Sequence, residues 1–298
     1  MVTAAAAVDD DIVTLDQPTF PAATSYTPPL TNRPFGNFGG SSCGGPLRDL
    51  IRVSCNSGFA QLAVELVGGD RLIDTAEDFG FNAVPPIDLP RPATSVMPSG
   101  FGEPLGTDVV LSPELLAQFD EVPELVPLTD NIPALAQSSS WQFDVRATPL
   151  QMAMVAAAIA NDGDVASPHV VSSVIDAQGN VIDEGETDPW RTAMTPTTAA
   201  VLRESMVEVV ASGTGRSLGI DGLVVGAKTG TAQIEESVEA THAWVIAFAG
   251  NDIDTPEIAI SVLVEADPEI GEQTGGTVAG PVAREVFEAF VVNGGDRE

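Results

Sequence analysis

The sequence predicts an α+β fold, in which helices flank an antiparallel sheet and a helical subdomain lies beside it. Two patterns support this prediction. Helical patterns dominate residues 47–165, whereas Val- and Ile-rich strands with hairpin-length connections dominate from residue 168 onward. A doubly wound parallel sheet would instead alternate strands with helices. We therefore expect one domain over residues 1–298, and its 44% of hydrophobic residues are enough for a packed core.

The first region is expected to consist of helices separated by loops. Residues 17–46 are rich in Pro, Gly, Ser, Thr and Asn, and residues 85–104 contain six prolines, so both stretches are predicted to be irregular. Between them lie three predicted helices, at residues 47–53, 59–67 and 70–79, the second of which ends at Gly68-Gly69.

Three later helices are predicted from their first residues. Ser112-Pro113, Thr148-Pro149 and Thr195-Pro196 each place a capping hydroxyl directly before a proline, which is typical of a helix start. The second of these helices is expected to reach Ala160, and the third to end near Ala211.

The sheet is expected from the remaining segments. Residues 169–175 and 181–182 read as two short strands around the turn Gln178-Gly179-Asn180. Three longer strands are predicted at residues 223–231, 243–249 and 258–265, followed by a last helix at residues 281–292.

The charge of the chain excludes several partners. Twelve Lys and Arg residues stand against 43 Asp and Glu residues, which gives a formal net charge of −31. A protein this acidic has no electrostatic footprint for nucleic acid or for an anionic membrane surface. The charge fits either a protein of a salty environment or an ordinary acidic surface.

The beginning of the chain has an unusual pattern. Residues 1–8 are apolar, but they have no basic leader and run directly into three aspartates, so they do not resemble a signal peptide. No stretch of the sequence is apolar enough for a membrane anchor. We interpret residues 1–8 as the later part of a helix whose beginning is missing.

A first candidate motif is Lys228-Thr229-Gly230-Thr231, at the end of a predicted strand. Lys228 is the only lysine of the chain, and two hydroxyls and a glycine stand beside it. Such a strand edge could bind an extended peptide, with the lysine and threonine directed at its carboxylate. A strand that simply ends in a turn is the alternative.

A second candidate motif is Ser54-Cys55-Asn56, between two predicted helices. In an extended linker, residues two apart face the same way, so Ser54 and Asn56 are expected to point into a cleft together. Ser and Asn are also common helix caps, which is the alternative. Cys55 and Cys43 are too few for a disulfide scaffold or a Cys-rich metal site, and form either one bridge or inert thiols.

Together with two further segments, these motifs resemble the transpeptidase domain of class B penicillin-binding proteins, in particular its actinobacterial members. The resemblance covers essentially the whole chain. It is carried by residues 54–63, 147–153, 213–215 and 228–233.

The resemblance implies a D,D-transpeptidase that joins peptidoglycan stem peptides ending in D-Ala-D-Ala and is also acylated by β-lactams. Ser54 would relay a proton to the leaving amine, Asn56 would hold the substrate amide, and Lys228 would tune Ser54. Thr229 and Thr231, beside Gly230, would bind the terminal carboxylate. The backbone N–H of Thr231 would form half of the oxyanion hole.

The resemblance also implies the surroundings of the protein. The family acts at the extracytoplasmic face of the cell membrane, with a glycosyltransferase as a possible partner and without a cofactor. A metal is not expected, because His169 and His242 lie in predicted strands away from any ligand cluster.

The sequence departs from the family at the nucleophile. The family's nucleophile is the serine of a Ser-x-x-Lys motif, but the residue three before Lys228 is Val225, so residues 1–298 contain no such motif. The family carries it directly before a stretch like residues 2–7. We therefore expect a truncated transpeptidase domain that labelled penicillin does not acylate.

Two alternatives remain beside truncation. The chain could be a pseudoenzyme that keeps the fold for binding, or a β-lactamase-like hydrolase, although no deacylation base is recognisable. Trp141, which follows Ser138-Ser139-Ser140, could alter a loop near the cleft or simply pack.

Overall fold

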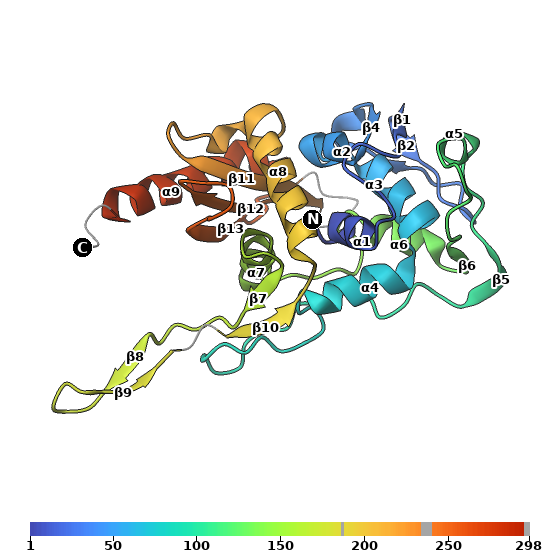
Figure 1. The fold of residues 1–298 in the computed structure, drawn as a ribbon. Coiled ribbons are helices and arrows are strands. Elements are labelled where there is room, and N and C mark those ends of the chain that lie inside the picture. Colours follow the sequence, from blue (N-terminus) through green and yellow to red (C-terminus); the bar gives the residue numbers. More distant parts are fainter. Residues whose placement is uncertain (186–187, 234–239, 295–298) are drawn as a thin grey trace.

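The computed structural model describes residues 1–185, 188–233 and 240–294. It has an α+β fold in which a three-stranded antiparallel sheet lies beside a group of helices (Figure 1). The helices are α1 (Val2–Asp9), α2 (Leu47–Val53), α3 (Asn56–Leu62), α4 (Gly69–Asp78), α5 (Pro113–Leu116), α6 (Ile132–Ser138), α7 (Pro149–Ala160), α8 (Pro196–Ser212) and α9 (Gly280–Gly294). Shorter helical turns are η1 (Phe38–Gly40), η2 (Ala63–Val67), η3 (Arg216–Leu218) and η4 (Gly275–Ala279).

The sheet has the strand order β11-β12-β13, so β11 is an edge strand. Its strands are β11 (Val224–Gln233), β12 (Thr241–Gly250) and β13 (Ile258–Val264). The pairing has no register shift, and Lys228 lies opposite Ile246. The three predicted strands are confirmed. However, β11 continues to Gln233, so Lys228 lies within the strand, where the sequence predicted its end.

The two faces of the sheet are covered by different helices. On one face, Ala227 and Val245 belong to an apolar cluster with Phe287 of α9. Because successive side chains of a strand alternate, Ile246 and Phe248 lie on the other face and join the main core, which includes α7 and α8. Lys228 is directed to this second face, toward the helical part of the molecule.

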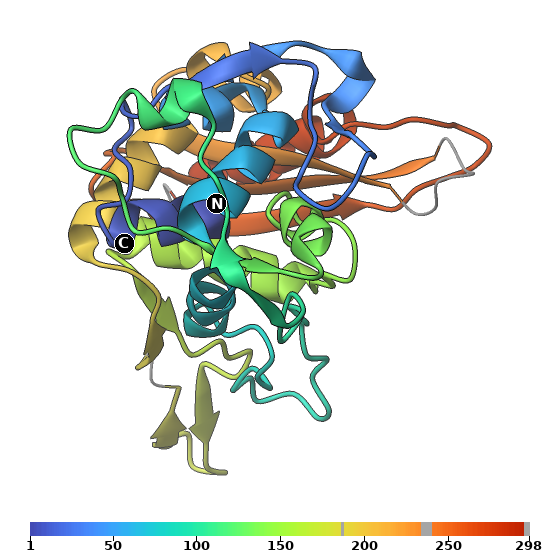
Figure 2. The same cartoon turned by 90° about the vertical axis from the view of Figure 1, so that its right-hand side faces the viewer.

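Helix α1 lies inside the main core. Residues Val2 to Ala7 are all buried, and α1 packs against α4, α8 and η2 (Figure 2). A helix that is apolar on every side is stable only when it is surrounded, and the four consecutive alanines let its neighbours approach closely. Residues 1–8 thus form a central helix, as their composition predicted.

The predicted helix starts are confirmed to different extents. The hydroxyls of Thr148 and Thr195 accept hydrogen bonds from the backbone of Gln151 and Thr198, and long helices follow. Ser112 precedes only one turn, α5, and its N–H donates instead to the buried Glu65 at 2.8 Å. The predicted helix at residues 59–67 begins earlier, at Asn56, and ends in the π-helical turn η2.

Short strand pairs extend from this framework, as β1–β4, β2–β3, β5–β6, β7–β10 and β8–β9. Their bounds are β1 (Phe20–Ala23), β2 (Ser25–Tyr26), β3 (Phe35–Gly36), β4 (Cys43–Gly45), β5 (Pro104–Asp108), β6 (Pro127–Thr129), β7 (Asp164–Ala166), β8 (Ser173–Ile175), β9 (Val181–Glu184) and β10 (Pro189–Thr192). Residues 17–46, predicted to be irregular, therefore contain four short strands.

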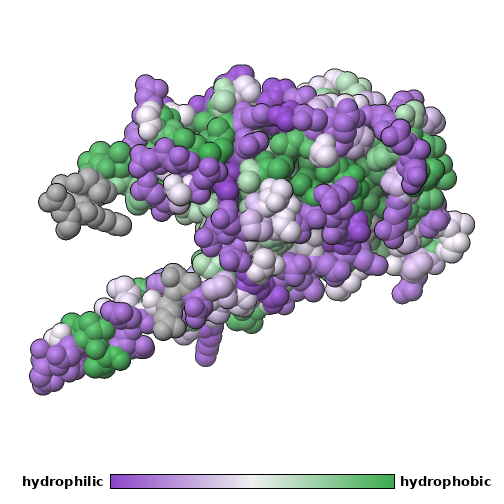
Figure 3. All heavy atoms as spheres, in the orientation of Figure 1, coloured by the Kyte–Doolittle hydropathy of each residue, from purple (hydrophilic) through white to green (hydrophobic). Residues whose placement is uncertain are grey.

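The hairpin β8–β9 projects from the body of the molecule as an arm (Figures 1 and 3). The prediction of a strand from residue 169 is wrong for residues 169–172. The N–H groups of Val170 and Val171 instead donate to the carboxylate of Asp88, both at 2.8 Å, and this holds the base of the arm. Within the described residues, no helix has the length and apolar character needed to cross a membrane.

Candidate active site

A large cavity lies along strand β11, beside the turn between α2 and α3. Its volume of about 2180 Å³ exceeds the ~300–1,000 Å³ of ordinary small-molecule sites, which leaves room for a peptide. The residues that the sequence singled out all line it. They are Ser54, Asn56, Lys228, Thr229, Gly230 and Thr231.

Lys228 joins the two motifs. Its Nζ donates to Ser54 Oγ at 2.7 Å and to the backbone carbonyl oxygen of Thr229 at 2.6 Å. Burial disfavours the charged ammonium and lowers the pKa of Lys228 from 10.5 to about 8. Because Ser54 Oγ accepts from the lysine, its own proton is free to be donated into the cavity.

Ser54 has a left-handed backbone with φ 58° and ψ 55°, so the predicted extended linker is wrong. Ser54 ends α2, and Asn56 already begins α3. The tight turn nevertheless has the predicted result, because Ser54 and Asn56 both line the cavity while Cys55 is fully buried. A left-handed serine is rare, and its cost of about 1–2 kcal/mol must be offset by the surrounding structure.

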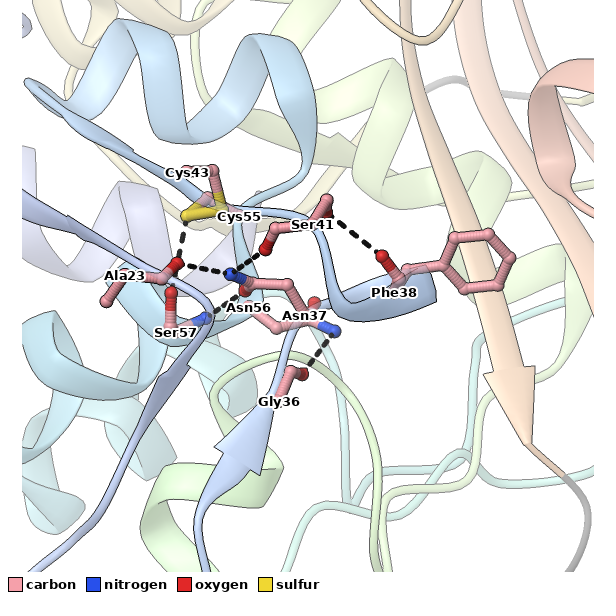
Figure 4. Close-up of a disulfide and its surroundings, with 9 residues drawn as sticks. All are labelled: Ala23, Gly36, Asn37, Phe38, Ser41, Cys43, Cys55, Asn56 and Ser57. Carbon is pink, nitrogen blue, oxygen red and sulfur yellow. Dashed lines mark hydrogen bonds between the residues drawn. A yellow bond between two sulfur atoms is a disulfide. The ribbon is translucent and has the colours of Figure 1, made fainter.

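A disulfide between Cys43 and Cys55 fixes this turn (Figure 4). It decides between the two alternatives that the sequence left open for the cysteines. Cys55 is the middle residue of the Ser54-Cys55-Asn56 motif, so the bridge ties the motif directly to the segment that contains β4.

Asn37 supports the same turn from a neighbouring loop. Its Oδ1 accepts from the N–H of Ser57 at 2.8 Å, and its Nδ2 donates to the carbonyl oxygens of Ala23 and Ser41 at 2.8 and 2.9 Å (Figure 4). Asn56 Nδ2 makes a longer contact of 3.4 Å with the carbonyl oxygen of Gly36. No pattern in the sequence marks Asn37, because only folding brings its partners together.

Thr229 is held by a side-chain contact with Thr214. Its Oγ1 lies 2.6 Å from Thr214 Oγ1, and the N–H of Thr214 donates to the carbonyl oxygen of Arg52 at 3.2 Å. Thr214 therefore connects β11 to the end of α2, next to Ser54. It belongs to the Gly213-Thr214-Gly215 segment that carried the family resemblance, but the sequence assigned it no role.

Two other features of the cavity concern its rim and its chemistry. Trp141 packs on Phe81, with ring centroids 4.9 Å apart, and it also lines the cavity. Among the described residues, no three His, Cys, Asp or Glu side chains are grouped to hold a metal ion.

The amino-terminal end of α1 opens into the same cavity. Met1 and Val2 line it together with Ser54 and Lys228. This end of α1 therefore belongs to the wall of the cavity that also contains the lysine and the serine.

The chain matches the model of the penicillin binding protein transpeptidase domain over residues 1–288, and it belongs to this family.

Among its relatives, the chain is 34% identical over 264 residues to the peptidoglycan D,D-transpeptidase PbpA of Mycolicibacterium smegmatis, covering 87% of this chain and 47% of that protein. It is 33% identical over 297 residues to PbpA of Mycobacterium tuberculosis, covering 97% of this chain and 53% of that one. The chain thus spans about half the length of these curated relatives. Both come from mycobacteria, in agreement with the resemblance to actinobacterial members of the family.

Solved structures give the same result. The penicillin G acyl-enzyme complex of penicillin-binding protein A from M. tuberculosis superposes with a TM-score of 0.76 at 29% identity, over 97% of this chain and 59% of that chain. The D,D-transpeptidase domain of a peptidoglycan glycosyltransferase from Eggerthella lenta gives a TM-score of 0.72 at 29% identity, over 98% and 64%.

Proposed function

We propose that this chain is the acyl-transferring part of a peptidoglycan D,D-transpeptidase, with peptides ending in D-Ala-D-Ala as donors and β-lactams as mimics of them. The observation that carries the proposal is the hydrogen bond from Lys228 Nζ to Ser54 Oγ, in a peptide-sized cavity on the open edge of β11. The names of the relatives support the same reaction.

The residues of the cavity take distinct roles in this reaction. A nucleophilic hydroxyl attacks the carbonyl carbon between the two D-alanines, and the bond to the second alanine breaks. Ser54 donates its proton to the departing amine nitrogen, and the proton lost by the attacking hydroxyl restores it, while Lys228 stabilises the serine oxygen during the transfer. The acyl group then passes to the amine of a second stem peptide.

The other residues bind the donor. In the proposed reaction, the amide of Asn56 holds a substrate amide. Thr229 and Thr231, with Gly230 between them, hold the terminal carboxylate at the edge of β11. Alternate N–H groups of an edge strand have no partner in the sheet, so the N–H of Thr231 can serve as an oxyanion donor. Removing one such donor typically costs about 2.7–4 kcal/mol of transition-state stabilisation.

We propose that the nucleophile is the serine of a Ser-x-x-Lys motif directly before α1, as the family resemblance implies. The amino-terminal end of α1 opens into the cavity beside Lys228 and Ser54, and the family carries Ser-x-x-Lys directly before this helix. We therefore expect activity only from a polypeptide with this motif before Met1, called here the extended chain. Membrane-bound, extracytoplasmic action beside a glycosyltransferase belongs to the same proposal.

Labelling with a fluorescent penicillin tests the proposal. The chain as given should remain unlabelled after denaturation, whereas the extended chain should carry one covalent label per molecule. Ser54→Ala and Lys228→Ala in the extended chain should each reduce the labelling rate at least about 100-fold, as expected for general acid–base groups. An extended chain that folds but takes no label would favour the non-catalytic binding module. Rapid turnover of a chromogenic cephalosporin would favour a hydrolase.

A further inference from the structure

The cavity differs from the rest of the molecule in its charge. Four basic residues line it, namely Arg33, Arg146, Arg216 and Lys228, although the whole chain has only 12. Of the 43 acidic residues, only Glu265 and Glu272 line it within the described part of the chain. A basic cavity in a chain of net charge −31 indicates a binding partner that is itself anionic.

Ion pairing distinguishes the cavity arginines from most other arginines of the described residues, although Arg91 and Arg191, outside the cavity, also lack a carboxylate partner. Five arginines form ion pairs with carboxylates within 4.0 Å, and none of these five lines the cavity; they are Arg48, Arg52, Arg71, Arg203 and Arg284. In the described residues, the side chains of Arg33 and Arg146 have no such carboxylate. Since carboxylates are so abundant in this protein, their absence around two exposed guanidinium groups leaves both available to a ligand.

Arg33 is carried by the loop that borders Asn56. The loop connects β2 to β3. Strand β3 contains Gly36, whose carbonyl oxygen accepts a hydrogen bond from Asn56 Nδ2. The N–H of Arg33 donates to Thr31 Oγ1 at 3.1 Å, which holds the loop locally. The guanidinium group therefore belongs to the side of the cavity that would hold the substrate amide.

Arg146 lies on a different segment of the same rim. Its N–H and carbonyl oxygen both pair with Val96, at 2.9 and 2.7 Å, so its backbone is fixed immediately before α7. The two acidic residues of the cavity, Glu265 and Glu272, come instead from the segment that follows β13. Among the described residues that line the cavity, none of the carboxylates comes from the segments that carry Arg33 and Arg146.

We propose that Arg33 and Arg146 are specificity-determining residues that bind a carboxylate of the donor peptide upstream of its D-Ala-D-Ala end. The inference rests on the proposed function and names the chemistry of its substrate: a stem peptide with a free side-chain carboxylate is preferred over its amide. The terminal carboxylate has its own partners in Thr229 and Thr231. Guanidinium groups suit this task because their planar donors match a carboxylate in two hydrogen bonds.

Peptide binding to the chain as given tests the inference without a nucleophile. Three fluorescent peptides are compared by anisotropy: one with a glutamate upstream of D-Ala-D-Ala, the same peptide with glutamine, and the glutamate peptide ending in L-Ala-L-Ala. At low salt the first should bind about 3- to 10-fold more tightly than the second, since each exposed ion pair contributes modestly. The preference should shrink at high salt.

Variants separate the two arginines from the general charge of the protein. Arg33→Gln and Arg146→Gln should each weaken the preference about 2- to 5-fold, and the double variant should remove it. Arg91→Gln is the matched control, because Arg91 is also exposed and lies outside the cavity. Thermal melting confirms that each variant is folded.

The outcomes distinguish this inference from the proposed function. Equal binding of the glutamate and glutamine peptides, or a preference that survives in the double variant, overturns the role of the two arginines. Equal binding of the peptides ending in D-Ala-D-Ala and L-Ala-L-Ala overturns the proposed function but leaves the carboxylate preference intact. Loss of the preference in Arg91→Gln would attribute it to net charge alone and overturn the inference.

Discussion

Lys228 Nζ lies 2.7 Å from Ser54 Oγ, and this hydrogen bond joins residues that are 174 positions apart in the chain. It brings the two motifs of the sequence together at the wall of one cavity, beside the space that a peptide would occupy. The lysine comes from an edge strand and the serine from the turn between α2 and α3. Each therefore depends on a different part of the fold, and three features of the structure hold them in place.

The first prediction concerns the charge of Lys228. Because it is the only lysine, ¹³C-labelled lysine gives a single side-chain resonance, whose titration should have its midpoint at about pH 8. The folded pKa lies below the unfolded value of 10.5, so the unfolded chain binds more protons between these values. The free energy of unfolding should therefore rise with pH from about 8 to 10.5, and the cost of burying the ammonium applies fully below this window.

Lys228→Met provides the control for this prediction, because it removes the titrating group. Urea unfolding should show that the protein with Lys228 gains stability relative to Lys228→Met as the pH rises from about 8 to 10.5. Parallel pH profiles for both proteins, or a lysine midpoint near 10.5, would contradict the burial of Lys228.

The sequence predicted the elements whose signals are local. The helix at 47–53, the Thr-Pro helix starts and the three long strands each follow from composition and caps within a few residues. The left-handed backbone of Ser54 could not be predicted in this way, because the bridge from Cys55 to Cys43 and the packing around it impose the turn. The contribution of Asn37 and the convergence of two arginines on one cavity likewise arise only from tertiary structure.

The second prediction concerns the disulfide. All cysteines should be oxidised, so denatured protein should show no free thiol before reduction. The bridge closes a short loop, with a sequence separation of 12, and its removal in a Cys43→Ser/Cys55→Ser variant should cost about 2–4 kcal/mol of unfolding free energy. Because Cys55 lies between Ser54 and Asn56, the variant made in the extended chain should also react more slowly with penicillin at temperatures where it is folded.

The control is the extended chain with both cysteines, measured in reducing agent. Its unfolding free energy and its rate of penicillin labelling should both match those of the double variant. A variant with lower stability but an unchanged labelling rate would show that the bridge does not position the motif.

The third prediction concerns Asn37. Asn37→Ala leaves the N–H of Ser57 and the carbonyl oxygens of Ala23 and Ser41 without their partner, and it should lower the unfolding free energy by about 1–3 kcal/mol. Asn37→Asp keeps the acceptor for Ser57 but loses both donated hydrogen bonds. Chemical denaturation should show it to be at least as unstable as Asn37→Ala, because a buried carboxylate oxygen then faces the two carbonyl oxygens. An Asn37→Ala protein as stable as the original would mean that water replaces all three contacts.

The fourth prediction concerns the contact between Thr214 and Thr229. Thr214→Val removes the hydroxyl that lies 2.6 Å from Thr229 Oγ1, whereas Thr214→Ser retains it. If this hydrogen bond orients Thr229, Thr214→Val should slow penicillin labelling of the extended chain about 5-fold, as expected for the loss of one hydrogen bond of about 1 kcal/mol. Thr214→Ser should restore most of the rate, which a purely structural role for the methyl group would not predict.

Gly276 gives an independent test of the same contact. A Cβ atom at this glycine would clash with the backbone oxygen of Thr214, so in Gly276→Ala either Thr214 or the turn η4 must shift, which disturbs the contact with Thr229. Gly100→Ala is the matched control, because a Cβ atom there meets nothing within 4 Å. Gly276→Ala should therefore slow labelling at least as much as Thr214→Val, while Gly100→Ala labels normally. Labelling at the original rate in both Gly276→Ala and Thr214→Val would exclude Thr214 as the residue that positions Thr229.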